Sequence, residues 1–185
     1  MVKEPHPGRV KTRLGRDLGH TQAAWWFRHQ TRRLIVRLSR DPRWQTVLAM
    51  SPDVEGLESR VWPAHVTRQP QGLGDLGDRM ARIFRSAPAG LVLIIGADIP
   101  NITSALIAKA FRALGDHDAV VGPSPDGGFW LIGLKNIRAV PSQIFANVRW
   151  STESALEDTL ATLGSLRVAR IDTLRDIDTI DDLRD

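Results

Sequence analysis

The sequence contains no cysteine among its 185 residues. Disulfide bonds and thiolate metal sites are therefore excluded, and the chain needs no oxidising compartment. No apolar run approaches the roughly 20 residues that a membrane-spanning helix requires. The segment from Met1 to Pro5 also lacks the apolar stretch of a signal peptide. These absences predict a cytoplasmic protein without a membrane span.

Several catalytic signatures are missing as well. No serine lies in a Gly-x-Ser-x-Gly elbow, and the five histidines include no pair four residues apart. Val10 stands where a Walker loop ending at Lys11 would need glycine. These patterns argue against a serine hydrolase, a zinc hydrolase and a P-loop NTPase.

The composition favours one globular domain over residues 1–185. Hydrophobic residues make up 42% of the chain and charged residues 25%, which is enough to bury a core. Residues 1–45 carry a net charge of +8, whereas residues 150–185 carry −5. A basic and an acidic end in one fold suit an anionic ligand held by cations and a metal ion. Solvated helix faces are the alternative interpretation.

Apolar patterning predicts alternating strands and helices. Strands are expected at 46–50, 91–95, 119–121, 129–134 and 168–171, and helices at 21–39, 75–86, 103–114 and 151–163, with a helical turn at 178–183. This order predicts an α/β fold, a single-domain three-layer α/β/α sandwich around a mostly parallel sheet with 91–95 at its centre. Ligands bind at the carboxyl ends of the strands in such sheets.

The first helix has a distinct apolar stripe. Thr21 is a candidate N-cap, and Trp25 and Trp26 cannot both lie on the buried face. The predicted buried positions are Ala24, Phe27, Leu34, Ile35 and Leu38.

The segment from Pro5 to Leu14 combines a glycine, Gly8, with the cations Lys11 and Arg13. Such a loop can fold backbone N–H groups and side-chain cations around a diphosphate. A solvated turn is the alternative interpretation of this segment taken alone.

A second loop, Gln71-Gly72-Leu73-Gly74-Asp75, leads into a predicted helix. Glycines let a ligand approach the backbone, and a helix N-terminus favours an anion or a polar base edge. We therefore include Gln71, Gly72, Gly74 and Asp75 among the nucleotide-binding candidates. A flexible turn with Asp75 as N-cap is equally compatible with this sequence.

Carboxylates follow the strongest predicted strand and crowd the C-terminus. Asp98 is a candidate ligand for Mg²⁺ or Mn²⁺, because these ions favour one or two carboxylates together with phosphate oxygens and water. A helix cap is the alternative for Asp98, although Thr103 is better placed to cap the next helix. Asp178, or alternatively Asp176, is the candidate second ligand, and an acidic C-terminal cap is the other interpretation.

The segment from Gly122 to Trp130 predicts an acceptor site. Asp126, Gly127, Gly128 and Trp130 are its candidate acceptor-binding residues, with Asp126 as a general base. A tight turn that requires Gly-Gly is the alternative.

Five motifs follow one another along the chain. They are Pro-x-Pro-Gly-Arg-Val-Lys-Thr-Arg-Leu, Gln-Gly-x-Gly-Asp-Leu-Gly-x-Arg-Met, Gly-x-Asp-x-Pro, Gly-Pro-x-x-Asp-Gly-Gly-Phe-Trp-Leu-Ile-Gly-Leu and Val-Arg-Trp-Ser-Thr. Together they resemble the bacterial DUF2064 family, which includes GT-A-type glycosyltransferases and radical-SAM/selenodomain-associated transferases. The resemblance spans Lys3 to about Asp182.

The resemblance implies a fold of the nucleotide-diphospho-sugar transferase type, shared with the molybdopterin-cofactor and phospholactate guanylyltransferases. It further implies that Lys11, Arg13, Gly72 and Asp75 cradle the nucleotide and that Asp98 holds the metal.

The chain departs from the family in two places. Only Met1-Val2 remains of the hydrophobic first strand, so we expect a chain that begins at Met1 to aggregate because neighbouring strands lose a partner. Gly-x-Asp-x-Pro also supplies one carboxylate where many GT-A glycosyltransferases have Asp-x-Asp.

The leading functional prediction is a metal-dependent glycosyltransferase that uses a nucleotide-sugar donor and an acceptor that the sequence does not identify. Lys11 and Asp126 are its candidate catalytic residues, with Lys11 stabilising the departing diphosphate. The alternative is a nucleotidyltransferase that uses a nucleoside triphosphate and releases pyrophosphate. A nucleic-acid-binding module based on the basic first helix is the least favoured class.

Overall fold

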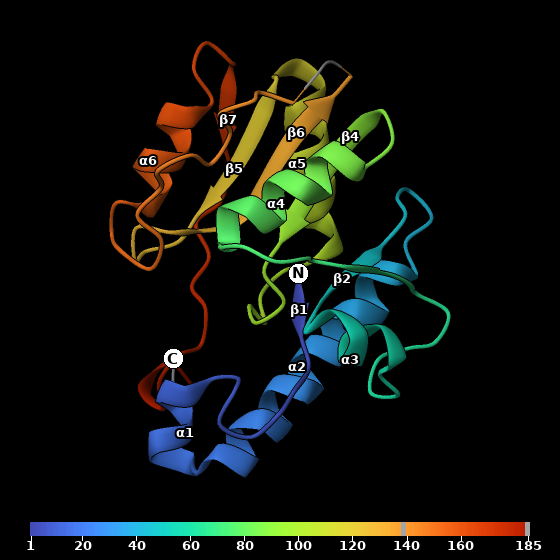
Figure 1. Ribbon diagram of the computed structural model, residues 1–185, viewed down its shortest axis with the longest axis vertical. Helices are drawn as coiled ribbons and strands as arrows, with labels where there is room; N and C mark the ends of the chain where they lie inside the picture. The colour runs from blue at the N-terminus through green and yellow to red at the C-terminus, as the bar shows by residue number, and fades with distance from the viewer. Residues whose placement is uncertain (138–139, 184–185) are drawn as a thin grey trace. The chain divides into compact units, whose positions relative to one another are not determined.

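The computed structural model describes residues 1–137 and 140–183 and divides into two compact units. The first unit comprises Met1–Pro70, Gly96–Ser104 and the segment from Asp176, and the second comprises Gln71–Ile95 and Ala105–Arg175. Figure 1 colours these segments along the chain. Neither unit is one continuous stretch of sequence, and the prediction of one domain over 1–185 stays a prediction.

The first unit contains a parallel three-stranded sheet in the order β1-β2-β3. Its strands are β1 (Val2–Lys3), β2 (Val47–Ser51) and β3 (Thr67–Pro70). Val2 lies opposite Met50, and Val47 lies opposite Thr67. The helical segments of this unit are α1 (Thr12–Leu18), α2 (His20–Ser39), α3 (Asp53–Glu58) and the 3₁₀ turn η1 (Asp181–Leu183).

The predicted apolar stripe of α2 is confirmed. All five predicted positions are buried, while Trp25 is 63% exposed and Trp26 packs against the core. The predicted N-cap is wrong, because the helix begins at His20 and Gly19 is the N-cap. With a φ of 88°, Gly19 provides a sharp turn from α1 into α2 that a residue with a Cβ rarely adopts.

The short first strand is also confirmed, since β1 contains only two residues. These residues pair with β2, and Val2 is 4% exposed within the core of the first unit. Its core neighbours include Phe27, Met50 and Trp62. The expected aggregation of the chain stays a prediction.

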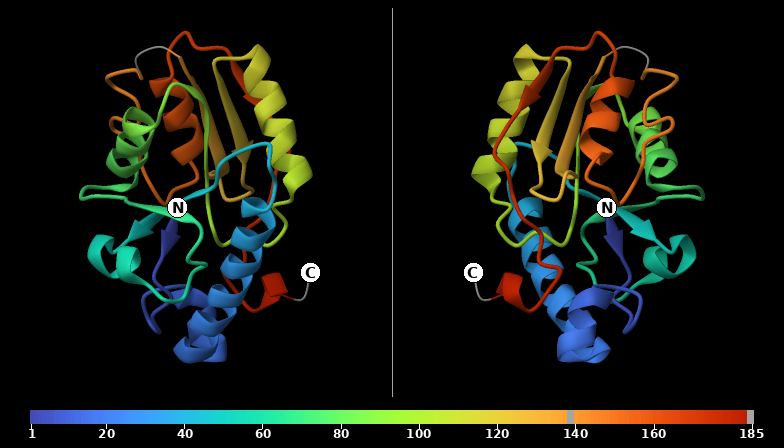
Figure 2. Two further views of the ribbon diagram at one scale, coloured as in Figure 1. Left: turned by 90° about the vertical axis from the view of Figure 1, so that its right-hand side faces the viewer. Right: turned by 90° about the vertical axis from the view of Figure 1, so that its left-hand side faces the viewer.

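The second unit contains a four-stranded sheet in the order β4-β6-β5-β7. The strands are β4 (Gly90–Ile95), β5 (Ala119–Pro123), β6 (Phe129–Asn136) and β7 (Val168–Arg170), and the helices are α4 (Leu76–Ser86), α5 (Ser104–Asp116) and α6 (Ala155–Thr162). Strand β6 is antiparallel to β4 and β5, whereas β7 is parallel to β5. Helix α5 covers one face of this sheet, and α4 and α6 cover the other (Figure 2).

The predicted α/β class and three-layer arrangement are confirmed, and three of the five strand pairings in the described residues are parallel. Three details differ from the prediction. The strands form two sheets rather than one, because in the described residues β1, β2 and β3 pair only with one another. Strand β4 is at one end of its sheet rather than at the centre, and Leu91 is 38% exposed. Helices α1 and α3 and strand β3 were not predicted, because they are short and lack a clear apolar period.

None of the helices in residues 1–137 and 140–183 is long and apolar enough to cross a membrane.

The turn between β5 and β6 is held tightly against the segment that precedes α6. Leu156 donates its backbone N–H to the Gly127 carbonyl oxygen at 2.9 Å, and Gly127 has a φ of 83°. A Cβ at Gly127 would overlap the backbone of Glu153. This turn therefore requires glycine both for its backbone conformation and for the close approach of another segment.

We predict that Gly127→Ala lowers the free energy of unfolding by more than about 1 kcal/mol, because alanine is strained at positive φ and the overlap adds to that strain. Gly115→Ala is the control, since a Cβ there meets open space in helix α5 and alanine favours a helix by up to about 1 kcal/mol. Urea unfolding of both variants measures the difference. Equal stability of the two variants would contradict the prediction.

Candidate functional site

Asp98 lies in a loop that helix α2 anchors. The Thr31 hydroxyl is fully buried and donates to the Ala97 carbonyl oxygen at 3.0 Å, and the Arg37 guanidinium donates to the Ile102 carbonyl oxygen. Ile102 is also fully buried. Hydrogen bonds on both sides of Asp98 thus fix the backbone that carries its carboxylate.

Asp178 lies in a turn that the Asp182 carboxylate closes. This carboxylate accepts the backbone N–H groups of Asp178 at 3.0 Å and of Thr179 at 2.7 Å. It also accepts the Thr179 hydroxyl at 2.7 Å. Asp182 therefore acts as the acidic C-terminal cap that was the alternative interpretation of this segment. The Asp178 side chain is left to contact other groups.

Lys11 lies at the start of α1 in the left-handed region, with φ 44° and ψ 50°. The loop before it is anchored by Glu4, which is 7% exposed and accepts the Ser59 hydroxyl at 2.7 Å and the Trp62 indole N–H at 3.1 Å. A left-handed conformation is unusual for a residue with a long side chain and costs free energy. The side chain of Lys11 is nevertheless buried, with an exposed fraction of 4%.

The Lys11 ammonium nitrogen is the point at which the site converges. It lies 2.7 Å from Asp98 Oδ2, 2.8 Å from Asp178 Oδ1 and 3.5 Å from Asp176 Oδ2. Arg13 Nη1 lies 3.2 Å from Asp178 Oδ2. The Lys11 side chain is 4% exposed, whereas that of Arg13 is 71% exposed. The structure thus brings together four residues that the sequence nominated separately for phosphate and metal: Lys11, Arg13, Asp98 and Asp178.

The close contacts in this cluster shift the pKa values of Lys11 and Asp178. Burial alone would lower the pKa of Lys11, but the charge of Asp98 and the hydrogen bonds that Lys11 donates to Asp178 and Asp98 raise it above its ordinary value. Burial would raise the pKa of Asp178, but the Lys11 hydrogen bond and the charges of Lys11 and Arg13 lower it. Both groups are therefore charged at neutral pH.

The donor set fits a hard divalent ion. In residues 1–137 and 140–183, no group of three or more His, Cys, Asp or Glu side chains is arranged to hold a metal. However, oxygens of Asp98 and Asp178 meet at one point, the Lys11 ammonium. Mg²⁺ commonly takes only one or two carboxylates and completes its octahedron with phosphate oxygens and water. Two carboxylates therefore suffice for a metal that arrives with a phosphate ligand.

The glycine loop before α4 belongs to the second unit and is braced by arginines. Arg82 donates to the carbonyl oxygens of Gln71 at 2.6 Å and Leu73 at 2.9 Å, and Arg79 donates to that of Gly74 at 3.0 Å. Gly72 and Gly74 have φ values of 78° and 102°. Gln71 is 3% exposed.

Asp75 is the N-cap of α4. The Asp78 backbone N–H donates to Asp75 Oδ1 at 2.9 Å, and the Asp75 backbone N–H donates to Asp78 Oδ2 at 3.1 Å, which forms a capping box. The capping interpretation is thus confirmed. Contact of Asp75 with a nucleotide stays a prediction.

Asp126 is exposed at the tip of the β5–β6 turn, at the carboxyl end of β5. Its Oδ1 accepts the Gly128 backbone N–H at 3.0 Å, and the Ser124 backbone N–H donates to the Gly128 carbonyl oxygen at 3.0 Å. The turn therefore presents the Asp126 carboxylate to solvent. This placement is compatible with acceptor binding, which stays a prediction.

Trp130 is a core residue of the second unit. It is 1% exposed, its ring lies against Gly122, and its indole N–H donates to the Asp172 carbonyl oxygen at 2.9 Å. A side chain this buried offers no surface to an acceptor, so the nomination of Trp130 as a contact needs correction. Its indole instead joins β6 to Gly122 in β5 and to the backbone at Asp172.

One motif residue, Arg149, had no predicted role. Its guanidinium makes two hydrogen bonds of 2.8 Å to the Asp158 carboxylate, and its backbone N–H makes a third of 3.0 Å. These hydrogen bonds lower the pKa of Asp158 to about 2. The pair ties the Val-Arg-Trp-Ser-Thr segment to α6. The sequence did not predict this ion pair, because an arginine and an aspartate nine residues apart form no recognisable local pattern.

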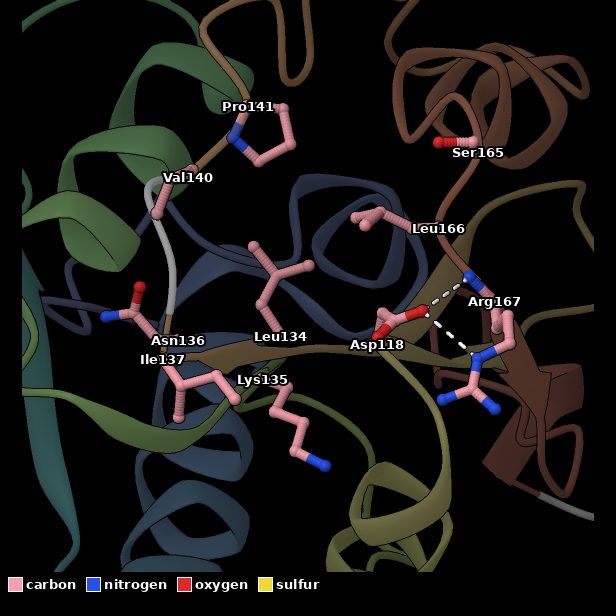
Figure 3. A pocket seen from close by; sticks show the side chains of 10 residues that line it. All are labelled: Asp118, Leu134, Lys135, Asn136, Ile137, Val140, Pro141, Ser165, Leu166 and Arg167. Atoms are coloured by element: carbon pink, nitrogen blue, oxygen red, sulfur yellow. Dashed lines mark hydrogen bonds and ion pairs between the residues drawn. The ribbon is translucent and has the colours of Figure 1, made fainter.

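A pocket of about 420 Å³ lies at the end of the second unit's sheet where β5 and β7 begin (Figure 3). Leu134, Leu166 and Arg167 are among its lining residues, and Asp118 accepts the Arg167 backbone N–H at 3.0 Å on one side. It includes none of the residues predicted for the site. Strands β5 and β7 begin here, so the pocket is distinct from the carboxyl-end position expected for a substrate.

Comparison with solved structures gives a strong match. A candidate nucleotide-diphospho-sugar transferase from Desulfovibrio desulfuricans G20 is 32% identical, with a TM-score of 0.88 over 98% of this chain and 81% of that chain. A homologue of Mycobacterium tuberculosis Rv0371c from Mycobacterium sp. strain JC1 is 17% identical, with a TM-score of 0.48 over 84% of this chain and 79% of that one. The second likeness is too low to support an argument. No curated protein matches the chain.

The family comparison agrees with the motifs. The model of a family described as "Uncharacterized protein conserved in bacteria (DUF2064)" matches residues 34–152, which is more than half of the chain. This match and the 32% identical solved structure together show that the chain belongs to the DUF2064 family, with the fold of a nucleotide-diphospho-sugar transferase.

Proposed function

We propose that this protein is a metal-dependent glycosyltransferase that takes its sugar from a nucleotide-diphospho-sugar. The observation that carries the proposal is the convergence of Lys11, Asp98 and Asp178. It combines a buried cation with carboxylates suited to a divalent ion, which is the pairing that a diphosphate needs. The similarity to a candidate nucleotide-diphospho-sugar transferase supports the same substrate class.

The chain's own residues have distinct roles in this proposal. Lys11 and Arg13 bind the diphosphate and stabilise the negative charge that develops on it as the glycosyl bond breaks. Asp98 and Asp178 hold Mg²⁺ or Mn²⁺, which supplies further positive charge to the departing diphosphate when bound. Gly8 lets the phosphates approach the N-terminal loop, since it is exposed with a φ of 76° and open space around it.

The candidate residues of the second unit have their own proposed roles. Gly72, Gly74 and Asp75 contact the nucleoside portion through a loop whose carbonyl oxygens are already fixed by Arg79 and Arg82. The side chain of Gln71 is buried, so Gln71 supports this loop rather than contacting the ligand. Asp126, supported by Gly127 and Gly128, binds a hydroxyl of the acceptor and serves as general base. The exposed carboxylate at the tip of its turn supports this assignment.

Nucleotidyl transfer is the second candidate function. The positions of the two candidate metal-binding carboxylates in the sequence support it. Asp98 and Asp178 come from segments 80 residues apart rather than from an Asp-x-Asp pair. In this reaction an acceptor phosphate would attack the α-phosphate of a nucleoside triphosphate and release pyrophosphate. The same two carboxylates and Lys11 would serve it.

The two reactions differ in their products. We expect incubation with a panel of sugar nucleotides and Mn²⁺ to release nucleoside diphosphate, and incubation with nucleoside triphosphates to release no pyrophosphate above the protein-free rate. Ion-exchange chromatography of the nucleotides and a coupled pyrophosphate assay measure both. The opposite result, pyrophosphate without diphosphate, would favour nucleotidyl transfer.

We predict that Asp98→Asn removes the Mn²⁺ dependence of nucleotide binding, because a neutral amide is a poor ligand for a hard cation. The loss is measured as the change in nucleotide-induced shift of the melting temperature, with and without Mn²⁺. Asp172→Asn is the matched control, since this half-buried aspartate pairs with Lys109 in the second unit. Metal-dependent binding that survives in Asp98→Asn would contradict the metal assignment.

Arg13→Ala is expected to weaken binding of a nucleoside diphosphate by about 1.5–3 kcal/mol, the usual value of a hydrogen bond to a charged group. Affinity for the corresponding nucleoside should not change, because it lacks phosphates. Arg16→Ala removes the same charge from an exposed position of the same helix and serves as the control. Isothermal titration calorimetry gives the affinities, and an equal loss in both variants would indicate a general charge effect.

A further inference from the structure

Lys11 occupies the position that the proposed divalent ion requires. Its ammonium nitrogen lies within 2.8 Å of one oxygen each from Asp98 and Asp178. A magnesium ion bound to the same oxygens would lie about 2.0–2.1 Å from each of them. Two cations that share these oxygens would repel each other at short range. The ammonium and the metal therefore exclude each other.

The ammonium is an integral part of this cluster. Its side chain is 4% exposed, and three carboxylates surround it, with Asp176 at 3.5 Å. Buried charges are stable only when they are paired and hydrogen-bonded, which the three aspartates achieve for Lys11. A free metal ion would have to displace the lysine into a position without those partners. A diphosphate offers such partners, because its oxygens can accept the ammonium as the metal takes the carboxylates.

We propose that Lys11 is an internal counter-ion that blocks the metal position in the free protein and moves to the diphosphate when nucleotide binds. Metal and diphosphate then bind with positive coupling, so that neither binds tightly alone. This inference rests on the proposed function for the identity of the anion. It adds a binding order that Asp98 and Asp178 would not impose by themselves.

The test measures Mn²⁺ binding without any nucleotide. Lys11→Met and Lys11→Gln remove the competing charge, so we expect both variants to bind Mn²⁺ about 5- to 150-fold more tightly than the unaltered protein, the usual range of such a coupling. Lys11→Arg keeps the charge and should bind as weakly as the unaltered protein. Electron paramagnetic resonance of free Mn²⁺ gives the dissociation constants, and thermal unfolding confirms that each variant is folded.

Arg13→Met is the matched control. It removes a positive charge that contacts the same carboxylate of Asp178, but from a side chain that is 71% exposed. An exposed ion pair contributes little, so its Mn²⁺ affinity should stay within about threefold of the unaltered protein. If Arg13→Met tightens Mn²⁺ binding as much as Lys11→Met, the effect is one of net charge and the inference is overturned. It is also overturned if the Lys11 variants bind Mn²⁺ no more tightly than the unaltered protein.

A measurement on the unaltered protein keeps the inference testable if the Lys11 variants fail to fold. Acetylation of individual lysines, followed by mass spectrometry, reports whether Lys11 changes its surroundings when Mn²⁺ and pyrophosphate are added together. We expect its labelling rate to change while that of Lys109, which pairs with Asp172, stays constant. An unchanged rate for Lys11 with Mn²⁺ bound would overturn the inference.

The same experiments separate the inference from the proposed function. Tight Mn²⁺ binding by Lys11→Met, combined with no effect of nucleoside diphosphates on any variant, would support the counter-ion role and contradict the nucleotide-sugar proposal. If Mn²⁺ and nucleoside diphosphate bind with the same coupling in the unaltered protein and in Lys11→Met, the result would support the nucleotide-sugar proposal and contradict the counter-ion role.

Discussion

The ion cluster around the Lys11 ammonium is the interaction on which the first unit depends. It joins the N-terminal loop, the loop after β4 and the C-terminal segment, which are far apart in sequence. Removing one partner of a buried ion pair costs much more than the pair itself contributes, because an uncompensated charge remains. The three segments are therefore held together by a requirement for neutralisation rather than by apolar packing alone.

The surroundings of the cluster fix its geometry. Glu4 anchors the start of the N-terminal loop, Thr31 anchors the backbone next to Asp98, and Asp182 closes the turn that carries Asp178. Thr31 donates its hydrogen bond, whereas the Glu4 and Asp182 carboxylates accept theirs. A site whose supporting residues are fixed in this way needs little reorganisation to bind a charged ligand.

The second unit uses a different device to present its candidate residues. Its loops are shaped by glycines and by backbone contacts, as at Gly127 against Glu153. Arginines brace the glycine loop before α4 through carbonyl oxygens. Such loops leave the Asp126 carboxylate exposed to solvent.

The sequence by itself determined the α/β class, the main strands and helices, and the apolar face of α2, because the spacing of apolar residues is a local property. It also nominated Lys11, Arg13, Asp98 and Asp178, since charged residues in loops after strands are visible in the sequence. Only the tertiary structure decided that these four converge, that Trp130 is buried, and that β4 lies at the end of its sheet. Those features depend on contacts between segments tens of residues apart, and no local pattern specifies which distant carboxylate will neutralise a buried lysine.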